Sequence, residues 1–298
     1  MPTLLVILGP TAVGKTALSI ALAEQYGCPI INADSRQLYA DLPIGTAAPT
    51  IEEQARVKHY FVGCLPIQEY YSASRYEQEA LTLIRRLFAT HDVLILTGGS
   101  MMYINAVCHG IDDIPTIDEA LRQDILGRYE RRGLEAMLGE LRLLDPAYYD
   151  VVDHCNPRRV LHALEICYQT GQTYTSLRRG EKKQRDFRIV KIGLERPREQ
   201  LFERINSRVT QMVEAGFIDE ARRMLPYRSC NALNTVGYKE IFRYLDGEWP
   251  LPMALDRMRK NTRVYAKKQM TWFRKDKDIL WFHPDEQQQI IDTIAQML

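Results

Sequence analysis

Several features of specialised protein classes are missing from this sequence. Six cysteines are scattered through 298 residues without a C-x-x-C pair, which argues against a zinc site or a disulfide framework and fits a reducing compartment. No apolar run approaches the roughly 18 residues of a membrane-spanning helix, and the first residues do not resemble a signal peptide. We therefore expect a cytoplasmic protein that has no membrane partner.

An excess of charge of one sign is missing as well. The 39 Lys and Arg residues nearly balance the 38 Asp and Glu residues, which leaves a net charge of +1. A global field will not attract nucleic acid, so any basic partner surface must be local. The chain is 46% hydrophobic and 26% charged, which argues against wholesale disorder and allows a sizeable core.

The most informative stretch has the spacing of a Walker A loop, G-x-x-x-x-G-K-[ST]. It follows the apolar run Leu4–Leu8 and precedes an amphipathic stretch, Ala17–Tyr26, which is the context that the motif needs. Backbone N–H groups in such a loop bind phosphate oxygens, Lys15 adds a cation, and Thr16 offers a hydroxyl to Mg²⁺. The sequence predicts a site for a di- or triphosphate, the alternative being a turn that merely caps a helix. The residues of the loop are Gly9, Pro10, Thr11, Ala12, Val13, Gly14, Lys15 and Thr16.

Strands alternate with helices through the first hundred residues. Pro29–Ala33 and Val93–Leu96 have the pattern of buried strands, and the capping-box spacing of Ser74–Glu77 predicts the start of a helix between them. This alternation predicts an α/β fold with a doubly wound parallel sheet, which binds ligands beyond the carboxyl ends of its strands. The P-loop, Asp34 and Gly98–Ser100 all fall there.

Asp34 follows the second predicted strand by one residue. An aspartate at this place could accept a proton from a substrate nucleophile or hold Mg²⁺ through water; the alternative is a turn or helix-cap aspartate. The third strand ends in Thr97–Ser100 without a Walker B aspartate. Its paired glycines either let the backbone approach a ligand or make a plain tight turn. The chain also lacks an N-K-x-D run, which argues against a GTPase.

From about Asp112 the pattern becomes helical, with periodic apolar stretches from Leu121 to Leu144, broken near Gly133, and from Val160 to Tyr168. A basic connector at 178–191 follows, a strand resumes at Ile189–Leu194, and helices are expected from Arg198 to the end. We predict a P-loop α/β core made of residues 1–111 and 187–298, with a helical C-terminal region. A helical insertion domain, 112–186, interrupts the core.

Two clusters of cations follow the last predicted strand. Arg204 and Arg208 share a helix face and could clamp a diphosphate. Residues 257–277 hold nine Lys and Arg against one acid, Asp276, with aromatic residues interleaved. Cations for phosphates and rings for unstacked bases suit a folded RNA. In both places the alternative is a solvated charged face.

Taken together, these motifs resemble the bacterial tRNA dimethylallyltransferases, also called tRNA isopentenyltransferases. The resemblance spans nearly the whole chain in order, and only the P-loop is specific by itself. The matching stretches are Gly9–Thr16, Asp34–Tyr39, Ile44–Ala47, Tyr71–Ala73, Gly98–Tyr103, Asn156–Val160, Val236–Lys239, Thr262–Arg263 and Ala266–Arg274.

The resemblance implies that a dimethylallyl group passes from dimethylallyl diphosphate to the exocyclic amine of the adenosine 3′ of the tRNA anticodon. The loop from Gly9 to Thr16 would hold the pyrophosphate with Mg²⁺, which Thr16 binds, while Lys15 and Arg208 neutralise the leaving group and Asp34 is the general base. The residues implied in contacts with the tRNA anticodon stem-loop are Asp34, Ser35, Arg36, Gln37, Ser100, Arg122, Arg158, Arg159, Val160, Leu161, His162, Asn234, Thr235, Val236, Gly237, Tyr238, Lys239, Lys267, Lys268, Gln269, Met270, Thr271, Trp272, Phe273 and Arg274.

Some positions depart from the pattern of the family. Ser100 and Met101 replace the usual Thr-Gly, His162 stands where Arg is common, and Lys268 keeps charge but loses the bidentate geometry of Arg. Two other functions remain open on the residues alone: a P-loop kinase acting on a small alcohol, and an RNA-binding regulator without transfer chemistry. We expect the protein to act as a monomer.

Overall fold

The computed structural model describes residues 1–112 and 114–298. These residues form two compact units. The first unit combines Met1–His109 with Gln184–Leu298, and the second is Gly110–Lys183. The predicted insertion, 112–186, covers nearly the same stretch as the second unit.

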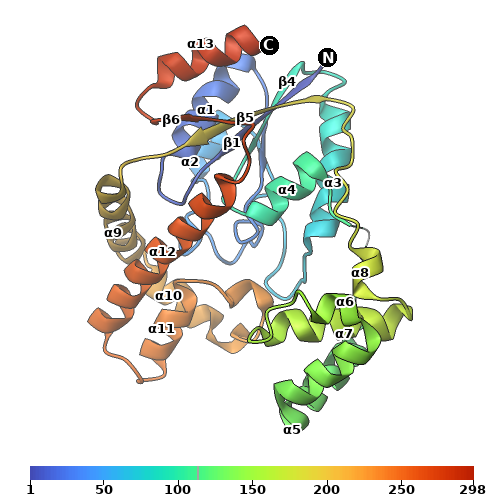
Figure 1. Ribbon diagram of the computed structural model, residues 1–298. Helices are drawn as coiled ribbons and strands as arrows, with labels where there is room; N and C mark the ends of the chain where they lie inside the picture. Colours follow the sequence, from blue (N-terminus) through green and yellow to red (C-terminus); the bar gives the residue numbers. More distant parts are fainter. Residues whose placement is uncertain (113) are drawn as a thin grey trace. The chain divides into compact units, whose positions relative to one another are not determined.

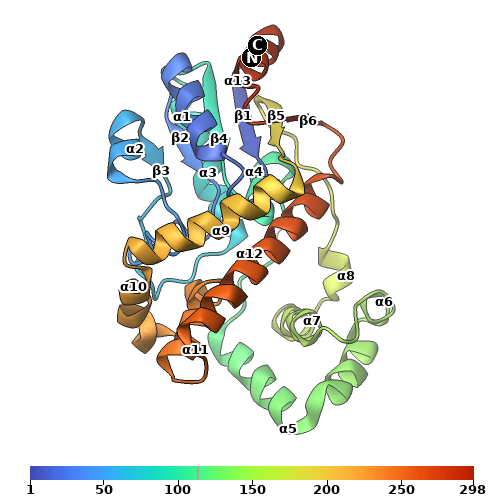
Figure 2. The same ribbon diagram turned by 90° about the vertical axis from the view of Figure 1, so that its left-hand side faces the viewer.

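The first unit is built on a six-stranded sheet in the order β3-β2-β4-β1-β5-β6. Every pair of neighbours is parallel, and helices lie on both sides of the sheet (Figures 1 and 2). The sequence therefore correctly predicts a P-loop α/β fold with a doubly wound parallel sheet. The strands are β1 (Thr3–Leu8), β2 (Ile30–Asn32), β3 (His59–Tyr60), β4 (Val93–Thr97), β5 (Arg188–Leu194) and β6 (Ile279–Phe282).

The central strand β1 is buried along its whole length, as expected of a strand with neighbours on both edges and helices on both faces. Two 3₁₀ turns, Leu225–Tyr227 and Asn231–Leu233, complete the helical connections. The helices of this unit are α1 (Lys15–Tyr26), α2 (Ile51–Arg56), α3 (Ala73–Leu87), α4 (Met101–His109), α9 (Arg198–Glu214), α10 (Phe217–Met224), α11 (Tyr238–Leu245), α12 (Leu251–Phe273) and α13 (Gln287–Met297).

Helices α9 and α12 lie side by side in both views (Figures 1 and 2). Polar contacts join them, among them a hydrogen bond of 2.9 Å from Arg263 to the side-chain oxygen of Asn206. Since α9 carries Arg204 and Arg208 and α12 carries the basic cluster, this packing brings the two predicted cation clusters onto neighbouring helices.

The second unit has its own small core, made of α5 (Glu119–Leu144), α6 (Pro146–Tyr149), α7 (Pro157–Thr170) and α8 (Tyr174–Leu177). The predicted break in the first helix is present, because Gly133 has φ 77° and ψ 174° inside α5. Asn156 caps α7 by accepting a hydrogen bond from the N–H of Arg159, and Pro157 occupies the first turn.

Two local predictions are wrong, and one strand was not predicted. Helix α3 begins two residues earlier than the Ser74–Glu77 spacing indicates, because Ser72 is its cap and accepts the N–H of Arg75. The two-residue strand β3 is too short to leave a pattern in the sequence. Strand β6 interrupts the expected run of helices after Arg198. It was not predicted because it has only four residues and directly follows a basic segment.

The seam between β5 and β6 yields a test of the fold. Gly193 pairs with Trp281, and a Cβ on Gly193 would lie 2.6 Å from atoms of both Trp281 and Ile279. Gly193→Ala should therefore destabilise the protein by about 1–3 kcal/mol, as overpacking does. Gly139→Ala, in α5, is the matched control: its Cβ meets nothing within 4 Å, and it should stabilise by about 0.5–1 kcal/mol. Urea unfolding of both variants decides; equal effects would argue against the β5–β6 packing.

Candidate active site

The Walker A loop lies between β1 and α1 in an uncommon backbone conformation. Gly9 has φ 146° and Gly14 has φ 119°, values that favour glycine. A Cβ on Gly9 would lie only 2.6 Å from the carbonyl oxygen of Leu194, so β5 leaves no room for a side chain there. Ala12 has φ 64°, which costs a non-glycine residue about 1–3 kcal/mol. Neighbouring contacts must therefore maintain this conformation.

Lys15 is folded back onto its own loop. Its ammonium donates hydrogen bonds of 2.9 Å to the carbonyl oxygens of Gly9 and Pro10. Burial, aided by repulsion from Arg208, lowers the pKa of Lys15 to about 7, while the negative charge of Asp34 opposes the shift. A phosphate oxygen beside this side chain would favour its charged form.

Two arginines bind two further carbonyl oxygens of the loop. Nε of Arg204 donates to the oxygen of Ala12 at 2.8 Å, and Nε of Arg196 donates to the oxygen of Val13 at 3.0 Å. Arg196 also forms an ion pair of 2.7 Å with Asp285. Cations thus bind the carbonyl oxygens of Gly9, Pro10, Ala12 and Val13, on both sides of Thr11, and these bonds support the positive φ of Ala12.

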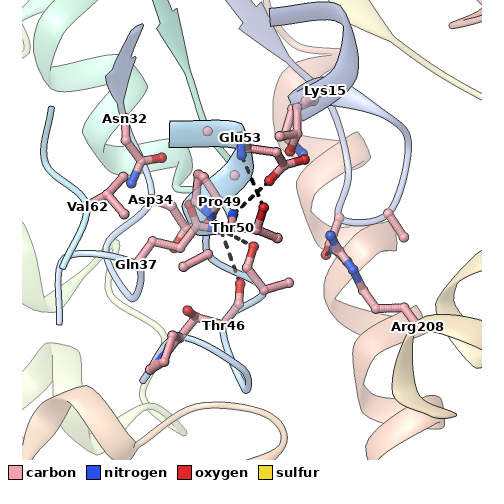
Figure 3. Close-up of a pocket in the computed structure, with 18 of the residues that line it drawn as sticks. Lys15, Asn32, Asp34, Gln37, Thr46, Pro49, Thr50, Glu53, Val62 and Arg208 are labelled. Atoms are coloured by element: carbon pink, nitrogen blue, oxygen red, sulfur yellow. Dashed lines mark hydrogen bonds between the residues drawn. The ribbon is translucent and has the colours of Figure 1, made fainter. Parts of the chain in front are cut away.

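Arg208 reaches the same loop from α9. Its Nη1 donates to the hydroxyl oxygen of Thr11 at 3.1 Å, and burial lowers the pKa of its guanidinium below the usual value. In Figure 3, Arg208 and Lys15 lie on one side of the cavity and Asp34 on the other. The alternative of a solvated charged face is therefore wrong for Arg208, and Arg204 uses its Nε to hold the backbone.

Asp34 has the properties of both of its sequence interpretations. Its Oδ1 accepts the N–H of Arg36 at 2.9 Å, as a turn aspartate does. Its side chain also lines the cavity, together with Lys15 and Arg208. No hydrogen bond to its Oδ2 is present among the residues that the structure describes. One carboxylate oxygen therefore orients the side chain and the other is available to a substrate.

The turn after β4 packs against the protein itself. A Cβ on Gly98 would collide with the backbone of Ala33, so this glycine permits the close approach of two strand ends, and it also lines the cavity. Ser100 is buried, and its hydroxyl accepts the N–H of Ser35 at 2.8 Å. The serine therefore fixes the turn that carries Asp34, and its side chain is not free to meet RNA.

Gln269 joins this turn to the P-loop from α12. Its Oε1 accepts the N–H of Thr11 at 2.9 Å, and its Nε2 donates to the oxygen of Gly99 at 2.8 Å. The side chain is buried. In this structure its amide bonds to the protein itself, and it occupies the N–H of Thr11. The predicted RNA contact of Gln269, which also lines the cavity, stays a prediction.

These elements enclose a cavity of about 1030 Å³ (Figure 3). The P-loop and Asp34 form one end, and residues 43–50 except Gly45 form another wall with Glu53, in which Thr50 and Glu53 cap α2 reciprocally. Residues of α9 and α12, among them Tyr265, also line it.

Oxygen-bearing side chains of Thr16, Asp34 and Glu53 are among those that line the cavity. Hydroxyl and carboxylate oxygens are the ligands that Mg²⁺ prefers in proteins. The described part of the chain contains no group of three or more His, Cys, Asp or Glu residues that could hold a metal ion.

The residues after Asp34 are tied to other parts of the same unit. Arg36 donates to the carbonyl oxygen of Asn231 at 3.0 Å, and the side-chain amide of Gln37 donates to the oxygens of Thr46 and Ala47. An RNA contact by either side chain would compete with these bonds.

The basic end of α12 presents both exposed and enclosed side chains. Lys267, Lys268, Thr271 and Trp272 are exposed, the last to 41%, and Met270 is half-buried. Arg274 is exposed and forms an ion pair with Glu195 at 2.6 Å. Phe273 is buried in the main core, so its ring is not exposed to a partner in this structure, and its predicted RNA contact stays a prediction.

The segment from Asn234 to Lys239 is divided in the same way. Asn234 and Lys239 are exposed, Thr235 and Val236 are half-buried, and Gly237 and Tyr238 are buried. The ring of Tyr238 is therefore not exposed in this structure, whereas Asn234 and Lys239 are available at the surface.

In the second unit, Arg158 and Arg159 are exposed at the start of α7. Val160 and Leu161 are buried in the core of that unit, so these two side chains support the helix and do not face a partner. His162 lies 3.3 Å from Glu165, and Arg122 lies 3.5 Å from the same carboxylate. In this structure, each of these two predicted RNA-binding side chains therefore lies beside the carboxylate of Glu165.

Sequence reasoning missed two residues that shape the site. Arg196 lies just past the carboxyl end of β5, the strand next to the P-loop strand, so the rule that found Asp34 also applies to it. Glu220 is a carboxylate on the apolar face of α10, beside Phe217 and Ala221, and is fully buried. The position of Glu220 among the apolar residues of one helix face could have indicated that its carboxylate is buried.

The described residues contain no helix that is long and apolar enough to cross a membrane.

Comparisons with known proteins agree with one another. The profile of the family described as IPP transferase matches residues 37–276. The chain is 59% identical over 294 residues to tRNA dimethylallyltransferase 1 of Bacteroides thetaiotaomicron, covering 99% of this chain and 96% of that protein. It is 59% identical over 292 residues to the protein of the same name from Phocaeicola vulgatus, covering 98% and 97%.

Two solved structures share the fold. The tRNA isopentenylpyrophosphate transferase of Bacillus halodurans superimposes with a TM-score of 0.72 at 35% identity, covering 99% of this chain and 96% of that one. A eukaryotic dimethylallyltransferase, described as acting on tRNA, superimposes with a TM-score of 0.76 at 27% identity, covering 92% and 70%.

The lowered pKa of Lys15 predicts how stability depends on pH. Between about pH 7 and 10, the unfolded state holds a proton on Lys15 that the folded state has lost, so wild-type stability should rise with pH. Relative to Lys15→Met, which has no such proton, the wild type should gain about 1–2 kcal/mol from pH 7 to pH 9. Urea unfolding at both pH values measures this difference, and a difference that stays constant would contradict the buried, depressed lysine.

Proposed function

The chain belongs to the IPP transferase family, and on that premise we propose that it transfers a dimethylallyl group from dimethylallyl diphosphate to tRNA. The observation that carries the proposal is the meeting of a phosphate-binding loop, two cations and one available carboxylate oxygen in a single cavity. A carboxylate opposite a diphosphate site suits a reaction in which a nucleophile loses a proton while pyrophosphate departs.

The proposed acceptor is the exocyclic amine of the adenosine 3′ of the anticodon. In the reaction, a bond forms between the amine nitrogen and the first carbon of the dimethylallyl group, and the bond from that carbon to the diphosphate oxygen breaks. The bond electrons leave with the pyrophosphate, and the amine proton moves to the carboxylate of Asp34. The product is a prenylated adenosine with free pyrophosphate.

Charge on the leaving group is the first problem that the chain must solve. Pyrophosphate gains negative charge as the carbon–oxygen bond breaks, so fixed cations and N–H groups beside it lower the barrier. Lys15 and Arg208 are the cations at the P-loop, and the N-terminus of α1 adds its dipole. When diphosphate displaces the carbonyl oxygens of Gly9 and Pro10 from the ammonium, Lys15 is held in its charged form.

Mg²⁺ is the proposed cofactor. When bound, it would offset the charge of the diphosphate oxygens. The hydroxyl of Thr16 is the protein ligand that we propose for it.

The tRNA surface that we propose has an exposed part in each unit. In the first unit it includes Lys267, Lys268 and Trp272 of α12. In the second unit it includes Arg158 and Arg159. Cations bind the phosphates of the anticodon stem-loop, and an exposed indole offers a stacking surface to an unstacked base. These contacts would offset the few kcal/mol needed to take the adenosine out of its stack.

Mass spectrometry of tRNA nucleosides tests the reaction directly. After incubation with dimethylallyl diphosphate and Mg²⁺, an adenosine should gain one C5H8 unit and pyrophosphate should be released in equal amount. Transfer of phosphate from labelled ATP to a small alcohol, without change in the tRNA, would establish the kinase alternative. Tight RNA binding without any covalent change would establish the regulator.

Replacement of the base should slow chemistry without removing the donor. Asp34→Asn keeps the size of the side chain and an oxygen for the N–H of Arg36, but it cannot accept the amine proton. Single-turnover transfer should slow by about 10²–10⁴-fold, the usual effect of a positioned general base. Affinity for dimethylallyl diphosphate should change little, because the P-loop and Arg208 remain.

A Mg²⁺ series supplies the control for this variant. If Asp34 acted by holding the metal, excess Mg²⁺ would restore part of the rate, and that outcome would contradict the general-base assignment. Rates near those of the wild type would contradict it as well.

The RNA surface is tested by salt. Lys267→Gln removes one exposed cation of α12 and should reduce the slope of log affinity against log salt by about one unit for each lost phosphate contact. Arg86→Gln, an exposed cation of α3 outside the proposed surface, is the matched control and should leave the slope unchanged. Filter binding of tRNA from 50 to 200 mM salt measures both; equal slopes would return Lys267 to a solvated charged face.

A further inference from the structure

Glu220 is a fully buried carboxylate in α10. Its oxygens accept hydrogen bonds from the N–H groups of Ile44 at 2.9 Å and Gly45 at 2.8 Å, and from the hydroxyl of Tyr238 at 2.6 Å. No ion pair of Glu220 occurs among the described residues. A buried carboxylate without a cation is costly unless donors surround it, so these three bonds must persist if the charge is to remain.

The segment that Glu220 holds forms a wall of the active-site cavity. We call residues 43–49 the cavity-wall loop; all of them except Gly45 line the cavity. Gly45 faces away from it, because a Cβ there would collide with the ring of Phe217 and lie 2.5 Å from the hydroxyl of Tyr238. On the side away from the cavity, the loop therefore packs so closely against Phe217 of α10 and Tyr238 of α11 that a methyl group does not fit at Gly45.

A second fixation acts on the same loop from the side of Asp34. The side-chain amide of Gln37 donates to the carbonyl oxygens of Thr46 at 3.1 Å and Ala47 at 2.9 Å. Ala47 has φ 48°, a conformation that such contacts can maintain. Figure 3 shows Gln37 and Thr46 together at the lower part of the cavity, below Asp34. The position of the cavity-wall loop is thus set by directed bonds and not by apolar packing alone.

Tyr238 and its neighbour Lys239 face opposite ways. Tyr238 is fully buried, with its ring 5.1 Å from that of Phe217 in an edge-on arrangement, while Lys239 is exposed. One short motif therefore serves two purposes: position 238 supports the cavity, and position 239 is available at the surface.

We propose that Glu220 and Tyr238 are positioning residues that fix the cavity-wall loop and thereby limit the length of the hydrocarbon chain of the diphosphate substrate. The inference rests on the proposed function, because it takes the occupant of the cavity to be an allylic diphosphate. The P-loop fixes the diphosphate end, and Pro43, Ile44 and Pro49 give the wall an apolar character. A cavity of about 1030 Å³ is too large to exclude a longer hydrocarbon chain by its volume alone. A wall that is fixed in position relative to the P-loop would exclude it.

Tyr238→Phe is the principal test, because it deletes one hydroxyl and keeps the ring against Phe217. Loss of a hydrogen bond to a charged group should raise KM for dimethylallyl diphosphate by roughly 3–30-fold, with a smaller change in kcat. The ratio of kcat/KM for dimethylallyl to that for geranyl diphosphate should fall, since a loosened wall admits the longer chain. Affinity for inorganic pyrophosphate and the salt slope of tRNA binding should stay within twofold of wild type.

Gly45→Ala perturbs the loop in the opposite sense. Its methyl group would push the loop away from Tyr238 and toward the cavity, so kcat/KM for geranyl diphosphate should fall more than that for dimethylallyl diphosphate. Lys239→Ala is the matched surface control: it should weaken tRNA binding and reduce the salt slope while keeping the chain-length ratio. Thermal unfolding of each variant identifies any that does not fold, and the remaining variant still decides.

The outcomes separate the inference from the proposed function. If the wild type prenylates tRNA and Tyr238→Phe and Gly45→Ala keep its chain-length ratio, the inference is overturned and the proposed function stands. A loss of tRNA affinity with a reduced salt slope in Tyr238→Phe would also overturn the inference, in favour of an RNA contact. If the wild type prenylates no tRNA, the proposed function fails and the inference with it.

Discussion

A loop that binds phosphate through its backbone N–H groups needs other partners for its carbonyl oxygens. In this protein, Lys15, Arg196 and Arg204 donate to four carbonyl oxygens of the P-loop, those of Gly9, Pro10, Ala12 and Val13. The three cations come from α1, from the end of β5 and from α9. Because the strands are parallel, their carboxyl ends lie at one edge of the sheet, and these elements meet there. The conformation of the P-loop therefore depends on hydrogen bonds from three separate elements of the fold.

Buried polar side chains extend this dependence from the P-loop to other parts of the first unit. Gln269 ties α12 to Thr11 and Gly99, and Glu220 ties α10 and Tyr238 to the wall of the cavity. Helices α11 and α12, which carry the exposed Lys239 and Lys267, are therefore hydrogen-bonded to segments that line the cavity. Buried polar groups whose donors and acceptors are all satisfied specify one arrangement more strictly than apolar packing does.

Most of the sheet and the P-loop could be predicted from the sequence, because both leave local patterns in it. The strands are short apolar runs, and the P-loop has glycines and a lysine at fixed intervals. Asp34 was singled out from its place after a strand, and Arg208 from its helical spacing with Arg204, which left a solvated charged face open as the alternative. Burial within a basic or polar stretch could not be predicted, since the neighbours of Gln269, Phe273 and Tyr238 come from distant segments. Strand β6 was missed because a four-residue edge strand leaves almost no periodicity.

The placement of β1 has a consequence for the order in which the chain can fold during its synthesis. Thr3 pairs with Arg188, 185 residues later in the chain (188 − 3), so the central strand waits for one edge partner while everything between is made. At about 5–20 residues per second this interval lasts roughly 10–40 s. The second unit, Gly110–Lys183, is contiguous and has its own core, so it can fold on the ribosome within that interval. We expect the sheet to close last, after the insertion is already compact.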